Sequence, residues 1–148
     1  MYKKLLVATD GSNLSKKAVR AAFDVAAALG AKVYIVQVIP KFVQAYFDSS
    51  YYASTKGEID KMEKSWEQKA QKSLDALIKS ANTKQVDVKT AIVKSYLVSD
   101  AILNVARKSN VDLIVMASHG RHGLKRLLLV SETLQVLTHS DIPVLVVR

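Results

Sequence analysis

The feature that most constrains this fold is a short run of consecutive apolar residues, Leu113–Ala117. The run is too short for a buried helix, and it contains no polar side chain that could face water. A strand that is apolar on both sides is typical of a parallel sheet with helices packed on its two faces. The run therefore predicts a mostly parallel sheet in an α/β protein.

Four other segments have the pattern of strands, and they are Lys3–Asp10, Lys32–Ile39, Val86–Val93 and Pro143–Val147. Apolar residues recur at helical spacing in the segments that begin near Leu14, Ile59, Leu97 and Ser131. Gly30 stands where the first helix needs a C-terminal cap. We predict one domain over residues 1–148, a doubly wound α/β fold with a five-stranded, mainly parallel sheet between about four helices.

One segment does not fit this alternation. Between Pro40 and Gly57 the chain has five aromatic residues and no sustained period, and it is long for a connection within a compact domain. We interpret the aromatic segment, residues 42–52, as a lid or a contact surface.

The composition excludes several classes of protein. The 148 residues include no cysteine, which excludes a disulfide framework, a thiolate metal site and a cysteine nucleophile. The first apolar run reaches Asp10 too soon for a signal peptide, and no run has the length of a membrane span. We expect a cytoplasmic protein without a membrane partner.

The charge is strongly positive. Twenty-two Lys and Arg residues against thirteen Asp and Glu residues give a formal charge of +9, which attracts nucleic acid, anionic membranes or phosphorylated small molecules. The lysines between Lys56 and Lys94 are interleaved with acidic residues, a pattern typical of a solvated helix face. Because no known nucleic-acid-binding motif accompanies the charge, the pattern favours this interpretation over a nucleic-acid surface.

The predicted topology indicates where a ligand would bind. In doubly wound sheets, ligands lie outside the carboxyl ends of the strands, where the strand order reverses. The positions to consider are the turn after Asp10, the end of the second strand near Val38 and the loop after Ala117.

Asp10 has two interpretations. Its carboxylate ends the first strand before Gly11 and Ser12, where it would accept hydrogen bonds from ribose hydroxyls. An aspartate at this position also commonly forms an Asx turn or a helix cap. The spacing leaves both interpretations open.

The loop after Ala117 contains two glycines and the cations Arg121, Lys125 and Arg126. Backbone N–H groups in such a loop and at the following helix N-terminus can bind a phosphate. Capping alone also explains Ser131 and Glu132 at the start of that helix. His119 and His122 lack a third ligand, so we predict no metal site, and no arrangement of nucleophile and base predicts a catalytic residue.

Three segments carry a family resemblance, and they are Leu5–Ser12, Asp112–Ser131 and Pro143–Val147. Together they resemble the universal stress protein family (the UspA-like domain) over essentially the whole chain. The resemblance implies a Rossmann-like fold of the adenine nucleotide alpha hydrolase-like kind. It also implies a stress-response or signalling module that binds ATP, with Mg²⁺, or AMP.

The phosphate signature of nucleotide-binding members is Gly, two residues, Gly, nine residues, then Gly followed by Ser or Thr. Here the frame has Ala117 and Gly120, nine residues, then Val130 and Ser131. Ala117 adds only a methyl group, whereas the β-branched Val130 disfavours positive φ and occupies the position of the phosphate tail.

The resemblance implies a role for each position of the site. Adenine would meet the backbone near Val38 and Met116, and ribose would meet Asp10 and Gly120. The phosphates would meet His119, Gly120, Ser131 and Glu132, with the Glu132 side chain pointing away or contacting them through Mg²⁺. Ala8 replaces the proline that usually precedes the Thr9-Asp10 pair. The predicted cofactor-binding set is therefore Ala8, Thr9, Asp10, Val38, Met116, Ala117, His119, Gly120, Val130, Ser131 and Glu132.

The last strand, residues 143–147, is apolar and predicted at a sheet edge, which a monomer would normally protect. Members of the family commonly dimerise through this strand, so we predict a homodimer.

Three alternatives remain. In a nucleotide-free family member, Val130 closes the phosphate pocket and the protein acts through protein contacts. A slow ATPase or nucleotidyl transferase ranks last, because no catalytic group is recognisable. Binding of nucleic acid by the basic residues is the remaining alternative.

Overall fold

The computed structural model describes residues 1–41, 49–119 and 132–148. In these residues the elements follow the order β1 (Lys4–Ala8), α1 (Asn13–Leu29), β2 (Lys32–Ile39), α2 (Ser49–Ala81), β3 (Val88–Lys94), α3 (Val98–Lys108), β4 (Leu113–Ala117), α4 (Glu132–His139) and β5 (Val144–Val147). The alternation of strands and helices that the sequence predicts is confirmed.

The five strands form one sheet in the order β3-β2-β1-β4-β5, and every neighbouring pair is parallel. The chain builds outward from β1 to β3, then crosses to the other side of β1 and continues through β4 to β5. The strand order therefore reverses between β1 and β4. The predicted doubly wound α/β fold is confirmed.

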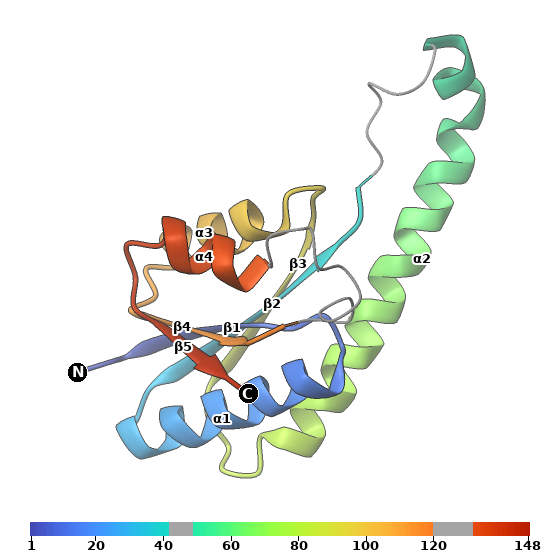
Figure 1. Cartoon of the computed structure of the whole chain (residues 1–148). Coiled ribbons are helices and arrows are strands. Elements are labelled where there is room, and N and C mark those ends of the chain that lie inside the picture. Colours follow the sequence, from blue (N-terminus) through green and yellow to red (C-terminus); the bar gives the residue numbers. More distant parts are fainter. Residues whose placement is uncertain (42–48, 120–131) are drawn as a thin grey trace.

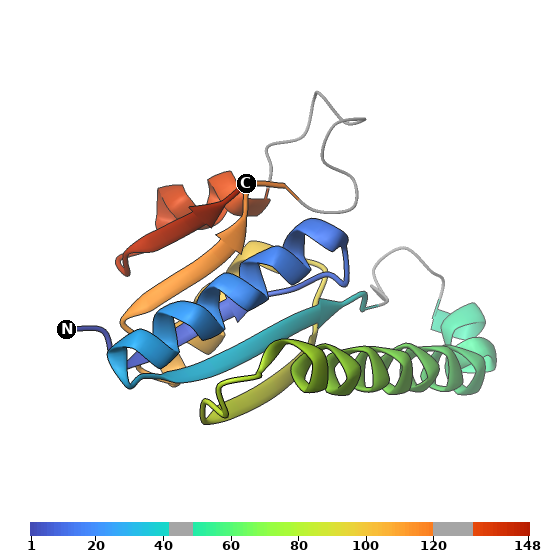
Figure 2. The same ribbon diagram turned by 90° about the horizontal axis from the view of Figure 1, so that it is seen from below.

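Helices α1 and α2 cover one face of the sheet, and α3 and α4 cover the other (Figure 1). Leu5 and Val7 of β1 join the core under α1 and α2, whereas Leu6 joins the core under α3 and α4. Every residue of β4 is buried, as expected for a strand that is covered on both faces. Figure 2 shows α1 and α2 next to each other on the face turned to the viewer.

Helix α1 begins and ends where its sequence signals lie. Ser12 is the N-cap, and its Oγ accepts a hydrogen bond from the backbone N of Ser15 at 3.2 Å. Gly30 ends the helix in the left-handed conformation, with φ 64°, and its N–H donates to the carbonyl of Ala26. The predicted C-cap is confirmed, because a glycine adopts this φ without strain.

Helix α2 is longer than predicted. It begins at Ser49, ten residues before the predicted start at Ile59, and includes Gly57. Its N-terminal part extends beyond the sheet (Figure 1) and does not pack on the core. This part of the helix therefore lacks the apolar stripe by which a helix is predicted from sequence. Residues 49–52 of the aromatic segment are therefore helical, and residues 42–48 lie outside the described part of the chain.

The strands are shorter than their apolar patterns at several ends. Strand β3 begins at Val88 rather than Val86, because the Asn82 side chain binds both the backbone N and the carbonyl of Val86 at 2.8 Å. Strand β1 ends at Ala8 rather than Asp10, because the next residues form the turn into α1. Side-chain bonds to the backbone thus set boundaries that apolar periodicity cannot indicate.

Within the described residues, we find no helix with the length and hydrophobicity that a membrane crossing requires.

Candidate functional site at the carboxyl edge of the sheet

Strands β1 and β4 pair in parallel, with Val7 opposite Val115, and both end at the same edge of the sheet. After β1 the chain enters α1, which packs on one face, whereas α4 packs on the opposite face. The residues after the two strands therefore lie where the strand order reverses. This is the edge at which doubly wound sheets bind their ligands.

The turn after β1 is an Asx turn. Asp10 Oδ1 accepts a hydrogen bond from the backbone N of Ser12 at 2.9 Å, and Gly11 has φ 78°. One of the two interpretations of Asp10 is thus confirmed. A carboxylate has lone pairs for several donors, so the Asx turn does not exclude a hydrogen bond from a ribose hydroxyl to Asp10. That contact stays a prediction.

A buried pair of hydroxyls supports this turn. Thr9 Oγ1 lies 2.9 Å from Ser15 Oγ, and it also accepts from the backbone N of Gly11 at 3.2 Å. Ser15 donates its own proton to the carbonyl of Ser12, so Thr9 is the donor to Ser15. The Thr9 backbone N donates to the carbonyl of Val36 at 2.9 Å, which fixes the turn to β2.

Sequence reasoning missed Ser15. The only signal is a second hydroxyl residue three positions after the N-cap, which is also common in helices without a ligand site.

The structure brings three of the predicted residues together on one face of the sheet. Ala8, Val38 and Met116 belong to the core cluster under α3 and α4, and they come from the neighbouring strands β1, β2 and β4. Ala8 and Val38 are half-buried, and Met116 is buried. They form an apolar floor near the carboxyl edge of the sheet.

The end of β4 is fixed by bonds to other elements. Ala117 is buried on the α1 and α2 side, and its carbonyl accepts from Thr133 Oγ1 at 2.8 Å. The backbone N of Ser118 donates to the carbonyl of Val147 at 2.8 Å, which prolongs the pairing with β5.

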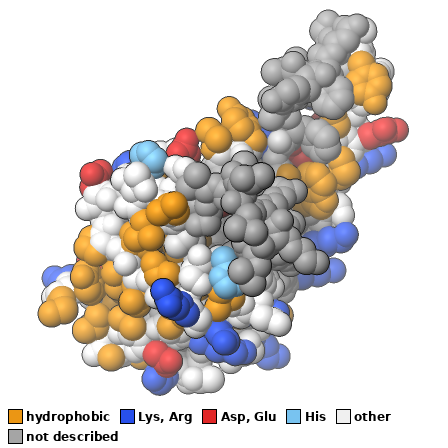
Figure 3. Space-filling model, viewed as in Figure 1, with side chains coloured by type: hydrophobic (Ala, Val, Ile, Leu, Met, Phe, Trp, Pro, Cys, Tyr) orange, Lys and Arg blue, Asp and Glu red, His pale blue; other side chains and the backbone are white. Residues whose placement is uncertain are grey.

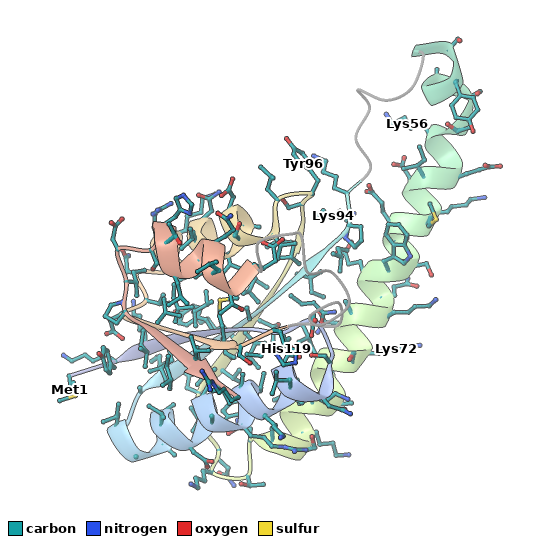
Figure 4. All side chains as sticks on the ribbon, viewed as in Figure 1. Met1, Lys56, Lys72, Lys94, Tyr96 and His119 are labelled. Carbon is teal, nitrogen blue, oxygen red and sulfur yellow. The ribbon has the colours of Figure 1, made fainter. Side chains whose placement is uncertain are left out.

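His119 follows β4 by two residues and is exposed, with its Nδ1 3.1 Å from Ser118 Oγ. Figure 4 shows its ring at the carboxyl edge of the sheet, beside the N-terminal end of α1. Gly120, Val130 and Ser131 lie outside the described residues, as do the loop cations from Arg121 to Arg126. Their predicted contacts stay predictions.

Glu132 points toward another helix. Its Oε2 accepts a hydrogen bond from the backbone N of Ser99 at 3.0 Å, in the first turn of α3. The N-cap of α3 is Leu97, which has no side-chain acceptor. Glu132 therefore supplies the cap that α3 lacks, and its carboxylate stabilises the positive end of that helix.

The described residues contain no group of three or more His, Asp or Glu side chains that is placed to hold a metal ion.

The chain was compared with known proteins. The sequence profile described as "Universal stress protein family" matches residues 1–148. The chain belongs to the universal stress protein family. It is 30% identical to Universal stress protein MJ0531 of Methanocaldococcus jannaschii, over 100% of this chain and 83% of that protein.

Solved structures agree with this assignment. The fold superposes on hypothetical protein MJ0577 of M. jannaschii with a TM-score of 0.81 and 28% identity, over 99% of this chain and 96% of the other. A universal stress protein in complex with cAMP is 24% identical with a TM-score of 0.65, over 99% of this chain and 96% of the other. One from Archaeoglobus fulgidus in complex with dAMP is 17% identical with a TM-score of 0.67, over 99% and 98%. At these last two identities the likeness shows the fold alone.

Proposed function

We propose that this protein is a homodimeric stress-response or signalling module that binds ATP or AMP at the carboxyl edge of its sheet. It would act in the cytoplasm as a single universal stress protein domain over residues 1–148. The observation that carries this proposal is the common position of the β1 and β4 ends, where the strand order reverses. Adenine nucleotides in two solved members of the family support the choice of ligand.

The described residues suit the nucleoside half of the ligand. Ala8, Val38 and Met116 give an apolar floor on which adenine would lie, recognised through nearby backbone groups. The Asp10 carboxylate, held by the Asx turn, would accept hydrogen bonds from the ribose hydroxyls. Because its own side chains hold the turn, its ordering would add little to the entropy cost of binding.

The phosphate half would use backbone N–H groups of His119, Gly120 and Ser131, together with the Ser131 hydroxyl and the positive end of α4. Mg²⁺ would neutralise the phosphate charge when ATP is bound. Glu132 would stay with α3 rather than contact the phosphates, as its bond to Ser99 favours.

The homodimer would form through β5. This strand lies at the edge of the sheet, and Leu145 exposes 38% of its surface. A second copy would cover this side chain and satisfy the free edge by strand pairing. Size-exclusion chromatography with light scattering would test the dimer, and Leu145→Lys is expected to give a monomer.

Val130 supports a second candidate function. Its branched side chain replaces the third glycine of the phosphate signature, and the second candidate is therefore a nucleotide-free member that acts through protein contacts. The first candidate predicts that the wild-type protein binds ATP. The second predicts that the wild-type protein does not bind ATP and that Val130→Gly does.

The deciding experiment is the release and chromatography of any nucleotide from the purified protein, followed by calorimetric titration with ATP and Mg²⁺. Asp10→Asn keeps an acceptor oxygen for the Asx turn but removes the charge. We expect it to weaken ATP binding by about 10-fold or more, because hydrogen bonds to charged groups contribute roughly 1.5–3 kcal/mol.

The matched control is Asp24→Asn, which removes an exposed carboxylate of α1 and should leave the affinity unchanged. If the wild type binds no nucleotide and Val130→Gly gains binding, the nucleotide-free candidate is correct. If neither protein binds, the proposed nucleotide site is wrong.

A further inference from the structure

One side of the molecule carries a group of cations on two neighbouring helices. Lys17 and Arg20 are exposed on the first two turns of α1, and Lys16 beside them is half-buried. Lys69 and Lys72 are exposed on the neighbouring part of α2. Among the described residues, none of these five cations forms a salt bridge. We call the five residues the basic face.

The five cations are near one another in space. Helices α1 and α2 contact each other on the same side of the sheet. Figure 3 shows blue side chains gathered over α1 and the adjacent part of α2. Figure 4 places Lys72 beyond the N-terminal end of α1, on the same face of the molecule.

Three of the six acidic residues of these helices pair with lysines outside the basic face. Asp24 pairs with Lys84 at 2.9 Å, and Glu63 and Glu67 pair with Lys94 of β3 at 3.7 and 3.3 Å. Asp75 accepts a hydrogen bond from Gln71 at 2.8 Å. In the described residues, no acidic side chain of these helices forms a salt bridge with a cation of the basic face, although Asp75 keeps its charge three residues from Lys72.

The opposite layer of helices is different. The described parts of α3, α4 and the turn after α4 carry the acidic residues Asp100, Glu132 and Asp141 beside the cations Arg107 and Lys108. Within the described residues, the α1 and α2 layer therefore carries the larger excess of cations, and α1 also contacts β5.

A membrane surface fits the basic face poorly. Segments that lie on membranes combine cations with large apolar side chains that enter the lipid. The large exposed apolar residues of the two helices, Leu29, Tyr51 and Met62, lie outside residues 16–20 and 69–72, which carry the five cations. Exposed cations without apolar anchors among them are suited to the phosphates of a nucleic-acid backbone, which need no insertion.

We infer that the basic face of α1 and α2 binds the phosphate backbone of duplex nucleic acid without regard to sequence. The inference does not depend on nucleotide binding at the carboxyl edge of the sheet. Neutralising five phosphates would release counterions, so the affinity for duplex DNA should fall as about the 4.5 power of salt concentration.

The experiment measures the fluorescence anisotropy of a labelled 24-base-pair duplex of arbitrary sequence with the full chain, from 50 to 200 mM NaCl. Over this range we expect the affinity to fall roughly 500-fold. The variant Lys17→Glu with Arg20→Glu should bind at least about 10-fold more weakly at 50 mM, with a salt exponent lower by about 2.

The matched control is Lys56→Glu with Lys89→Glu, which makes the same charge change at exposed lysines outside the basic face. Lys56 lies near the far end of α2 (Figure 4). This control should keep most of the affinity, and circular dichroism should show both variants to be folded.

The inference is wrong if the wild type does not bind the duplex at 50 mM NaCl, or if both double variants lose the same affinity. It is also wrong if the protein binds phosphatidylserine vesicles and not the duplex.

Discussion

The two strand ends that meet at the candidate site are held in different ways. After β1, the side-chain bonds of the turn into α1 join residues close in sequence, namely Thr9, Asp10, Ser12 and Ser15, and one backbone bond from Thr9 reaches β2. After β4, the contacts join residues that are far apart. Thr133 bonds to Ala117, 16 residues away, and Glu132 bonds to Ser99, 33 residues away.

This difference indicates how each half of the site is formed. The β1–α1 turn can adopt its conformation as soon as its own residues come together, since its bonds close short loops. The start of α4 takes its position only when α3, α4 and β4 have packed. We therefore expect substitutions within the β1–α1 turn to have the largest effects on stability. The conformation at the end of β4 should depend on the packing of α3 and α4.

The largest expected effect is at Thr9. Thr9→Val keeps the shape of the buried side chain but removes the donor to Ser15 and the acceptor for Gly11. Two buried or half-buried polar groups lose a partner, so we expect a loss of about 2 kcal/mol in the free energy of unfolding, measured by urea denaturation. Thr90→Val, at an exposed position of β3, is the control, and an equal loss there would contradict the special role of the β1–α1 turn.

The second effect is at Thr133. This side chain is also buried, but Thr133→Val removes only one bond, to the carbonyl of Ala117. We expect a loss of about 1 kcal/mol, because a typical hydrogen bond contributes that amount. Thr138→Val removes a similar bond to Leu134 from an exposed side chain and should have a smaller effect. Similar losses in Thr9→Val and Thr133→Val would remove the proposed difference between the two strand ends.

The third effect is at Glu132. Glu132→Ala removes the acceptor that caps α3, and we expect a loss of about 0.5–1 kcal/mol, the lower part of the range for helix caps, since this bond is exposed. Glu132→Gln keeps an acceptor oxygen and should restore much of the stability. Hydrogen exchange of the Ser99 amide is the direct measurement. Unchanged protection in Glu132→Ala would show that the bond does not stabilise the start of α3.

The same difference explains what the sequence could predict. The five strands and their parallel arrangement follow from apolar runs such as Leu113–Ala117, because burial on both faces leaves few other folds. The Asx turn at Asp10 and the cap at Gly30 were also accessible, since each depends on neighbouring residues. Local chemistry and burial are both visible in a single sequence.

Contacts between distant residues were not accessible in this way. Nothing near Leu97 indicates that Glu132 caps α3, and nothing near Lys94 indicates its pairing with Glu63 and Glu67. The start of α2 at Ser49 was missed for a related reason. A helix that extends beyond the sheet needs no apolar stripe there, so its periodicity gives no signal.

The smallest expected effect is at the opposite, amino edge of the sheet. Lys32 Nζ lies 2.8 Å from Asp87 Oδ2, and both side chains are exposed. The hydrogen bond and the attraction between the charges lower the pKa of Asp87 from 3.8 and raise the pKa of Lys32 from 10.5. Exposed pairs of this kind contribute little to stability, and salt screens them.

The direction of the pH effect follows from these shifts. Because the pKa of Asp87 is lower in the folded protein, its contribution is complete above pH 3.8 and is lost as the pH falls through the folded pKa. The contribution of Lys32 is complete below pH 10.5 and is lost as the pH rises through its raised pKa. Asp87→Asn should therefore lower the Tm slightly at pH 7 and leave it unchanged well below pH 3.8. A larger Tm change in Asp87→Asn than in Thr133→Val would mean that the amino edge, and not the candidate site, contains the stronger polar contacts.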